Sequence, residues 1–114
     1  MTNETREGSY NGWTNYPTWC VNLWLGNDQG LYNEALDLTR ETLESDHPTS
    51  TVWTVEESQR FNVADKLKDW VTDALTPDLG ASFPADLLGW ALAHVDWNEI
   101  ADSWIESVRD QVTA

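Results

Sequence analysis

The residue types that most often do chemistry in proteins are few in this chain. It has two histidines, His47 and His94, and one cysteine, Cys20. Neither histidine has a cysteine or a second histidine at the short spacing that a metal site needs. Asp96 and Glu99 stand near His94 and could orient it as a general base, but no activated nucleophile accompanies them. We therefore expect no enzyme, metal site or cofactor, and a structural role for His94 at a helix C-terminus.

The chemical property that the sequence offers in quantity is negative charge. Twenty Asp and Glu residues against six Lys and Arg give a formal net charge of −14. Such a surface repels nucleic acid and anionic lipid and favours basic partners. The same composition is typical of a protein adapted to high internal salt, so composition leaves both interpretations open.

The carboxylates fall into three stripes when the chain is placed on helices. A rotation of about 100° per residue gathers them into narrow sectors opposite the apolar arcs. Neighbours within a stripe stand one turn apart, where like charges destabilise a helix by about 0.2–0.5 kcal/mol per pair. The three stripes are Glu34, Asp37, Glu41 and Glu44; Asp65, Asp69 and Asp73; and Glu99, Asp102, Glu106 and Asp110.

A carboxylate stripe can imitate the backbone of a nucleic acid. One helical turn is about 5–6 Å, which is close to the spacing of successive phosphates along a strand. The stripes therefore predict a partner with a basic groove, and no direct binding of nucleic acid, because the chain has no basic patch of its own. The alternative is that they are the solvated outer faces of amphipathic helices.

Five helices are expected to carry these side chains. Apolar residues recur at helical spacing between capping residues and Gly or Pro stops. Thr54 with Glu57, and Asp96 with Glu99, have the pattern of capping boxes. Asn27 or Asp28 can cap the second helix. The expected helices cover about 16–26, 28–45, 55–76, 83–93 and 97–112.

The apolar faces of these helices predict which side chains fill the core. The fourth helix is apolar on nearly every side and has few charges to place in water, so we expect it to be central. In the first helix we expect Trp19 and Trp24 to point into the bundle. The whole buried face expected for that helix is Tyr16, Trp19, Cys20, Leu23 and Trp24.

The sequence therefore predicts an all-α protein, a compact bundle of about five helices. The Thr- and Val-rich stretch near residues 50–55 is expected to be a loop, with a short extended segment as the alternative. Residues 1–9 are polar and are expected to form a flexible N-terminal arm, and residues 10–114 a single helical domain. Eight tryptophans, each able to bury roughly 150–250 Å², let one small core suffice.

The expected location is the cytoplasm. A single cysteine excludes an intramolecular disulfide and fits a reducing compartment. The N-terminal segment has no apolar stretch of the kind that directs export, and no later run approaches about 18 apolar residues. We therefore expect neither secretion nor a membrane partner.

The run from Asn11 to Leu25 is the most distinctive part of the chain. It reads Asn-Gly-Trp-Thr-Asn-Tyr-Pro-Thr-Trp-Cys-Val-Asn-Leu-Trp-Leu. It resembles the Asn-Gly-Trp-x-Asn-Tyr-x-Thr-Trp-x-Val-x-Leu-Trp-Leu signature of small proteins of bacteriophages, archaeal viruses, plasmids and other mobile elements. Pro17 departs from the charged or polar residue expected there, which the first turn of a helix tolerates. The resemblance implies that a mobile element carries this protein. Small acidic proteins of such elements often act as antagonists of host defence, including anti-CRISPR and antirestriction proteins that look like nucleic acid to their targets.

The same run also has a physical interpretation. Asn11 and Gly12 suit a tight turn, and Trp13 could pack back against the first helix as a hydrophobic staple. In that interpretation the run is a folding nucleus. The alternative is a functional aromatic surface, with Trp13 or Tyr16 exposed as an interface anchor.

These observations combine into one functional hypothesis. The chain is expected to be a non-enzymatic acidic binding protein of a phage or mobile element. It would inhibit a nucleic-acid-handling defence complex in the host cytoplasm by presenting its stripes to a basic surface, with Trp13 and Tyr16 as anchors. The alternative is a salt-adapted helical accessory protein that binds a protein partner through apolar surface. Self-association through surplus tryptophan surface is a third hypothesis, because the sequence leaves the oligomeric state open.

Overall fold

The computed structural model describes residues 10–45 and 54–113, and these residues form five α-helices and no strand. The all-α bundle that the sequence predicts is confirmed. A π-helical turn, η1 (Val71–Leu75), continues the third helix. The α-helices are α1 (Tyr16–Asn27), α2 (Gln29–Ser45), α3 (Val55–Trp70), α4 (Phe83–Ala93) and α5 (Trp97–Thr113).

Each helix begins at a polar side chain that accepts a backbone hydrogen bond, which satisfies one of the free N–H groups of the first turn. The capping box that the sequence predicts at Thr54 is present. Its hydroxyl accepts from the Glu57 N–H at 3.1 Å, and the Glu57 carboxylate accepts from the Thr54 N–H at 2.9 Å. The capping residues are Asn15, Asp28, Thr54, Ser82 and Asp96.

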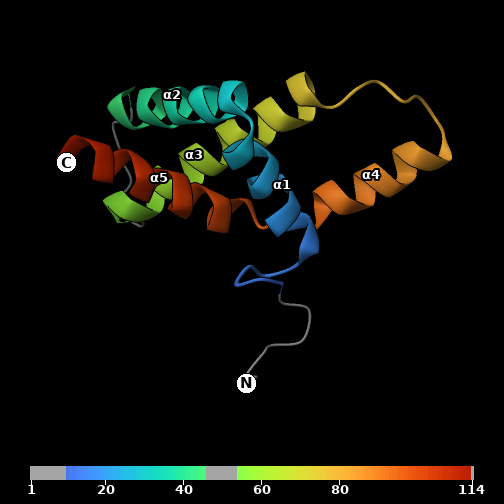
Figure 1. Ribbon diagram of the computed structural model, residues 1–114, viewed down its shortest axis with the longest axis horizontal. Coiled ribbons are helices and arrows are strands. Elements are labelled where there is room, and N and C mark those ends of the chain that lie inside the picture. The colour runs from blue at the N-terminus through green and yellow to red at the C-terminus, as the bar shows by residue number, and fades with distance from the viewer. Residues whose placement is uncertain (1–9, 46–53, 114) are drawn as a thin grey trace.

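The core lies where α2, α3 and α5 pack against one another, with α1 across one end (Figure 1). Each of the three helices buries one apolar arc, as its periodicity predicts. Leu67 and Ile100 are fully buried at the centre, and Leu25 is the contribution of α1. The remaining core side chains are Ala35, Leu36, Val63, Ala64, Val71, Val95, Trp97, Ala101, Trp104, Ile105 and Val108.

The prediction that α4 is central is wrong. None of its residues is buried, and Phe83, Leu87 and Trp90 expose 78%, 58% and 57% of their surface. In Figure 1 the helix extends away from α2, α3 and α5. Apolar composition shows that a helix needs cover but does not say which element provides it. Here the other helices supply the buried core, and α4 contributes the partly buried Leu92 beside it.

The face of α1 that the sequence places in the core points largely to solvent, which is a second correction. Trp24, Tyr16 and Leu23 expose 64%, 53% and 37% of their surface. The buried residues of α1 are instead Thr18 and Leu25, which lie about half a turn away on the helix.

Two polar contacts with α5 and its N-cap residue explain this orientation of α1. The Thr18 hydroxyl accepts a hydrogen bond from the Asp96 N–H at 2.9 Å. The Asn22 amide oxygen accepts one from the indole N–H of Trp104 at 3.0 Å. Because buried donors need acceptors, these contacts turn the polar arc of α1 inward. The aromatic arc is left outside.

Some expectations fall outside the described residues. These are the flexible arm at residues 1–9, the environment of His47, and most of the extended piece considered near 50–55. The end of that piece is described: Thr54 is the N-cap of α3 and Val55 is its first residue.

Candidate functional surfaces

The three carboxylate stripes lie on the outer faces of α2, α3 and α5. Ten of the eleven side chains are exposed, and Glu99 is half-buried. On each helix the stripe stands about half a turn from the buried arc. The sequence therefore predicts the orientation of every stripe correctly.

The stripes of α2 and α3 border one seam, because these two helices pack side by side. A shallow hollow of about 320 Å³ is lined by Glu34, Asp37 and Glu41 of α2 together with Trp70 of α3. A second hollow of the same size adds Asp65 and Asp69 of α3. We call the whole set the acidic ridge: Glu34, Asp37, Glu41, Glu44, Asp65, Asp69 and Asp73.

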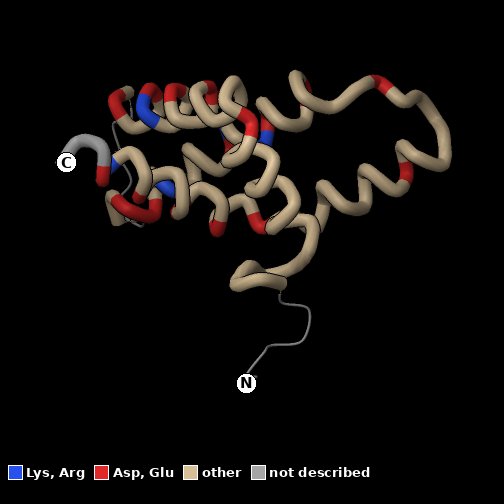
Figure 2. Tube along the Cα trace, in the orientation of Figure 1, with Lys and Arg blue, Asp and Glu red and all other residues tan. Residues whose placement is uncertain are grey.

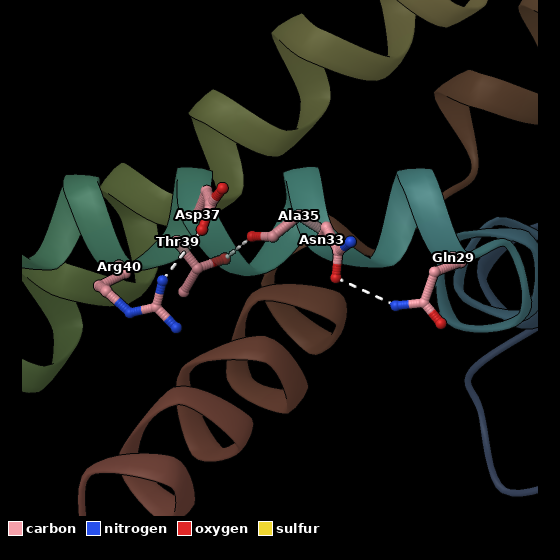
Figure 3. Close-up of polar contacts among 6 residues, drawn as sticks. All are labelled: Gln29, Asn33, Ala35, Asp37, Thr39 and Arg40. Atoms are coloured by element: carbon pink, nitrogen blue, oxygen red, sulfur yellow. Dashed lines mark hydrogen bonds and ion pairs between the residues drawn. The ribbon is translucent and has the colours of Figure 1, made fainter.

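Cations are sparse along the acidic ridge. Arg40 contacts Asp37 at 3.0 Å, and Figure 3 shows this pair on the surface of α2. The other α2 contacts in that view run along the helix, from Thr39 to the Ala35 carbonyl and between the Gln29 and Asn33 amides. Lys66 lines the seam and forms no ion pair with the described residues.

The stripe of α5 has more positive charge around it. Arg60 of α3 contacts Asp102 at 3.6 Å. Arg60 and Arg109 share with Asp102 and Glu106 the walls of a hollow of about 240 Å³ between α3 and α5. Glu99 accepts a hydrogen bond from the Thr14 N–H at 3.1 Å. The two stripes of the acidic ridge are therefore the ones that present charge with least compensation.

The residues considered as a general base and its orienter lie at helix ends. The Nδ1 of His94 is 2.8 Å from the Trp90 carbonyl, and the imidazole stacks on the Trp90 indole at 4.2 Å. The Asp96 carboxylate accepts from the Glu99 N–H at 3.1 Å and caps α5. The Asn15 amide donates to the His94 carbonyl at 2.7 Å. These contacts give each group a structural task at the junction of α1, α4 and α5.

The distinctive N-terminal run begins with the predicted tight turn. Asn11 and Gly12 have φ of 48° and 88°, and Tyr10 and Trp13 exchange two backbone hydrogen bonds of 2.7 Å. This geometry suits Asn-Gly because both positions need positive φ. Trp13 is half-buried and packs against the core, so it is not an exposed anchor. Tyr16 remains as the exposed aromatic residue of the predicted pair.

Tyr16 is held in an aromatic cluster at the start of α1. Its ring centroid lies 5.1 Å from that of Tyr10, edge to face, and 5.5 Å from that of Trp19. Tyr10 and Trp19 are 4.8 Å apart. Trp19 therefore packs in this cluster rather than in the centre of the bundle. Cys20, through its charge when ionised and a hydrogen bond, raises the pKa of the Tyr16 phenol.

A second surface, which the sequence interpretation missed, joins α1 and α4. An open groove of about 480 Å³ runs between them, lined by Tyr16, Cys20 and Val21 on one side and Leu87 and Trp90 on the other. Tyr16, Leu87 and Trp90 line this groove and are also exposed. We use the name apolar face for the exposed apolar side chains of these two helices: Tyr16, Leu23, Trp24, Phe83, Leu87 and Trp90.

A signal for the apolar face was present in the sequence. The segment Tyr16–Asn27 contains no charged residue, and Phe83–Ala93 contains only Asp86. Two helices without a charged side would both have to be covered, and the chain has only one small core. Figure 2 shows the contrast, with red along α2 and α5 and almost none on α1 and α4.

Within 10–45 and 54–113, no group of three or more His, Cys, Asp and Glu residues is placed to hold a metal ion. In the same part of the chain, no helix combines the length and apolarity needed to cross a membrane.

The fold and its surfaces define a class: a small all-α domain with strongly acidic outer helices and one uncharged apolar face. The chain belongs to a family of unknown function, DUF7249, whose model matches residues 6–109. The match covers all five helices up to the last turn of α5. Comparison with curated proteins and with solved structures gave no match.

Proposed function

We propose that this protein is a non-enzymatic inhibitor from a phage or other mobile element. It acts in the cytoplasm of the host cell, where its acidic ridge occupies the basic groove of a nucleic-acid-handling defence complex of the anti-CRISPR or antirestriction type. The observation that carries the proposal is the line of Glu34, Asp37, Glu41 and Glu44. All four are exposed on one face of α2, and Asp37 contacts Arg40.

The geometry of the acidic ridge supports a groove as the partner surface. Successive carboxylates on α2 stand one turn apart, close to the spacing of phosphates along a strand. The α3 stripe, with Asp65 and Asp69, borders the same seam and adds a second row of carboxylates to the surface. A basic groove that holds a duplex presents cations to two rows of negative charge in a similar way.

The cost of the arrangement also supports a functional use of the charge. Carboxylates three or four residues apart on α2 repel one another by about 0.2–0.5 kcal/mol per pair. Solubility of a small domain needs a net charge of only about 2–8 in magnitude, well below the −14 of this chain. Screening by salt lowers the cost, so the alternative of salt adaptation predicts a melting temperature that climbs steeply towards molar KCl. A fold that is stable at low salt favours the proposal.

The test compares two variants that lose the same amount of charge. The ridge variant carries Glu34→Gln, Asp37→Asn, Glu41→Gln and Glu44→Gln. Its matched control carries the amide replacements of the α5 stripe at Glu99, Asp102, Glu106 and Asp110. Each variant removes four negative charges, so a difference between them reports position and not net charge.

Wild type and both variants serve as baits for host lysate in about 0.1 M and about 1 M salt. We expect nucleic-acid-binding defence proteins to be retained by the wild type and the α5 variant at low salt, and lost by the ridge variant. Each captured protein is then tested for displacement of its DNA in a mobility-shift assay. With about 0.2–1 kcal/mol for each of the exposed pairs that are lost, the ridge variant should need roughly fourfold to several hundredfold more protein. Equal capture and displacement by all three baits contradicts the proposal.

A further inference from the structure

The apolar face is large for a monomer. Four of its side chains are aromatic, and Tyr16, Trp24, Phe83 and Trp90 each expose more than half of their surface. With roughly 150–250 Å² for each aromatic side chain, the exposed fractions amount to roughly 400–600 Å². This sum over both helices is comparable with the largest contiguous patch on a typical monomer, about 300–600 Å². Leu23 and Leu87 bring the area towards the roughly 800 Å² per partner of a standard interface.

The charge around the groove limits what can cover this face. An acidic protein would be expected to attract a basic amphipathic helix, whose cations need carboxylates at the rim of the groove. No charged side chain lines this groove, and the carboxylate on α4 is Asp86. A basic helix seated here would therefore leave its cations without partners. The occupant that fits is an apolar surface with almost no charge.

A second copy of the chain offers such a surface. Two chains with a net charge of −14 repel each other wherever their acidic helices meet, and the face of α1 and α4 is where that repulsion is least. The face is also suited to pairing with itself. A ridge of Phe83, Leu87 and Trp90, spaced at i, i+4 and i+7, lies beside the groove that a partner's ridge could fill. A twofold axis brings each ridge to the other groove.

We propose that this protein forms a symmetric homodimer in which the apolar face of one chain covers the apolar face of the other. Residues Leu87 and Trp90 are the central contacts, because they both line the groove and stand on the exposed ridge. The acidic ridge is carried by other helices and stays available in the dimer. This inference therefore goes beyond the proposed inhibitory function and does not depend on it.

Sedimentation equilibrium at several protein concentrations tests the proposal. We expect a monomer–dimer equilibrium that shifts towards the dimer as KCl is raised from about 0.1 M to about 1 M, because salt screens the repulsion between the two chains. Binding through the acidic ridge has the opposite salt dependence. A wild-type protein that sediments as a monomer at every concentration and salt overturns the inference.

The variants Leu87→Glu and Trp90→Glu locate the interface. Each places a carboxylate at the centre of the face, and we expect the dimer to weaken by about a hundredfold or more. Both side chains are exposed in the monomer, so the variants should keep wild-type helicity by circular dichroism. The matched control is Val55→Glu, which adds the same charge at an exposed apolar residue in the first turn of α3. It should dimerise like the wild type, and equal dimerisation by all three variants overturns the inference.

The single cysteine gives a second readout that needs no substitution. Cys20 lines the groove and is half-buried in the monomer, so a thiol reagent should label it at a measurable rate. We expect that rate to fall as the wild-type concentration rises through the dimerisation range, and to stay constant for Leu87→Glu. A dimer whose Cys20 labels at a rate independent of concentration is formed through another surface, and contradicts the proposal.

Discussion

The two sides of this molecule differ in where their helices place apolar side chains. On α2, α3 and α5 the apolar arc is buried in the core and the opposite arc carries carboxylates, so each helix is complete within one chain. On α1 and α4 the arc that faces solvent is itself apolar, and charge is almost absent from both helices. Folding of a single chain buries the apolar arcs of the first side. It leaves the apolar arcs of α1 and α4 in contact with water.

The difference indicates how a protein with so much negative charge can still associate specifically. Net charge keeps chains apart and suppresses unspecific contacts over most of the surface. An uncharged apolar face in one place then selects the geometry in which two surfaces meet.

The largest expected effect comes from the core of the charged side. The Ile100 side chain is fully buried, with 0% accessible surface, so Ile100→Ala leaves a cavity in the core. We expect the free energy of unfolding to fall by about 2–5 kcal/mol. Chemical denaturation followed by circular dichroism measures it, at a protein concentration low enough to keep the chain monomeric.

Trp90→Ala is the reference on the apolar face. A side chain that is mostly in water loses little when truncated, so we expect a change of about 1 kcal/mol or less in the monomer. A loss comparable to that of Ile100→Ala would mean that α4 packs centrally in solution. The comparison of the two sides would then be wrong.

The next largest effect is expected where the two sides are joined. Thr18 has no accessible surface, and its hydroxyl accepts from the Asp96 N–H and donates to the Asn15 amide oxygen at 2.7 Å. Thr18→Val keeps the shape and removes both bonds, which leaves the part-buried Asp96 N–H without this acceptor. We expect a loss of about 1–3 kcal/mol in the free energy of unfolding. Thr72→Val, at an exposed site in η1, should change it by about 0.5 kcal/mol or less.

The sequence predicts the charged side well and the junction poorly, for a physical reason. On α2, α3 and α5 the apolar residues repeat at helical spacing and the carboxylates fall opposite, so one pattern determines both faces. On α1 the orientation is decided by hydrogen bonds of Thr18 and Asn22 to residues more than seventy positions away. Hydrophobic periodicity does not register such contacts. It therefore assigned the aromatic arc to the core.

The helix ends were also predictable, and the placement of α4 was not. Caps are local, since Thr54 and Ser82 bond to backbone groups three residues along the chain. The position of α4 depends on how much core the other helices already fill. The amount of core depends on apolar residues throughout the chain, so the composition of Phe83–Ala93 alone does not predict where α4 lies.

A smaller effect, of opposite sign, is expected on the acidic ridge. The amide replacements at Glu34, Asp37, Glu41 and Glu44 remove repulsion along α2 and lose the Asp37–Arg40 contact. With about 0.2–0.5 kcal/mol for each like-charge pair, we expect a net gain of about 0.5–1 kcal/mol. The melting temperature should rise by a few degrees at low salt, and the gain should shrink towards about 1 M KCl.

Asp78→Asn is the control for that gain, because Asp78 lies in the segment before α4, away from the stripes. Its carboxylate accepts from the Gly80 N–H at 3.0 Å, which an amide oxygen can also do. We expect no change in melting temperature at either salt concentration. A ridge variant that is less stable than wild type at low salt would show that the carboxylates of α2 stabilise the fold.

The smallest effect is expected on the apolar face at alkaline pH. The pKa of Tyr16 is raised above 10.0, first by the charge of ionised Cys20 and then by a hydrogen bond with it. A raised pKa means that the folded chain holds this proton more tightly than the unfolded chain. The resulting stability is present below pH 10 and is lost as the pH rises through the folded pKa. Tyrosinate absorbance should therefore show late ionisation of Tyr16 in the wild type, and Cys20→Ala should bring the Tyr16 pKa back towards its ordinary value. Because Tyr16 is in water, an unchanged titration in Cys20→Ala would mean that the two side chains do not meet at the groove. It would then place the edge of the apolar face differently from the geometry described above.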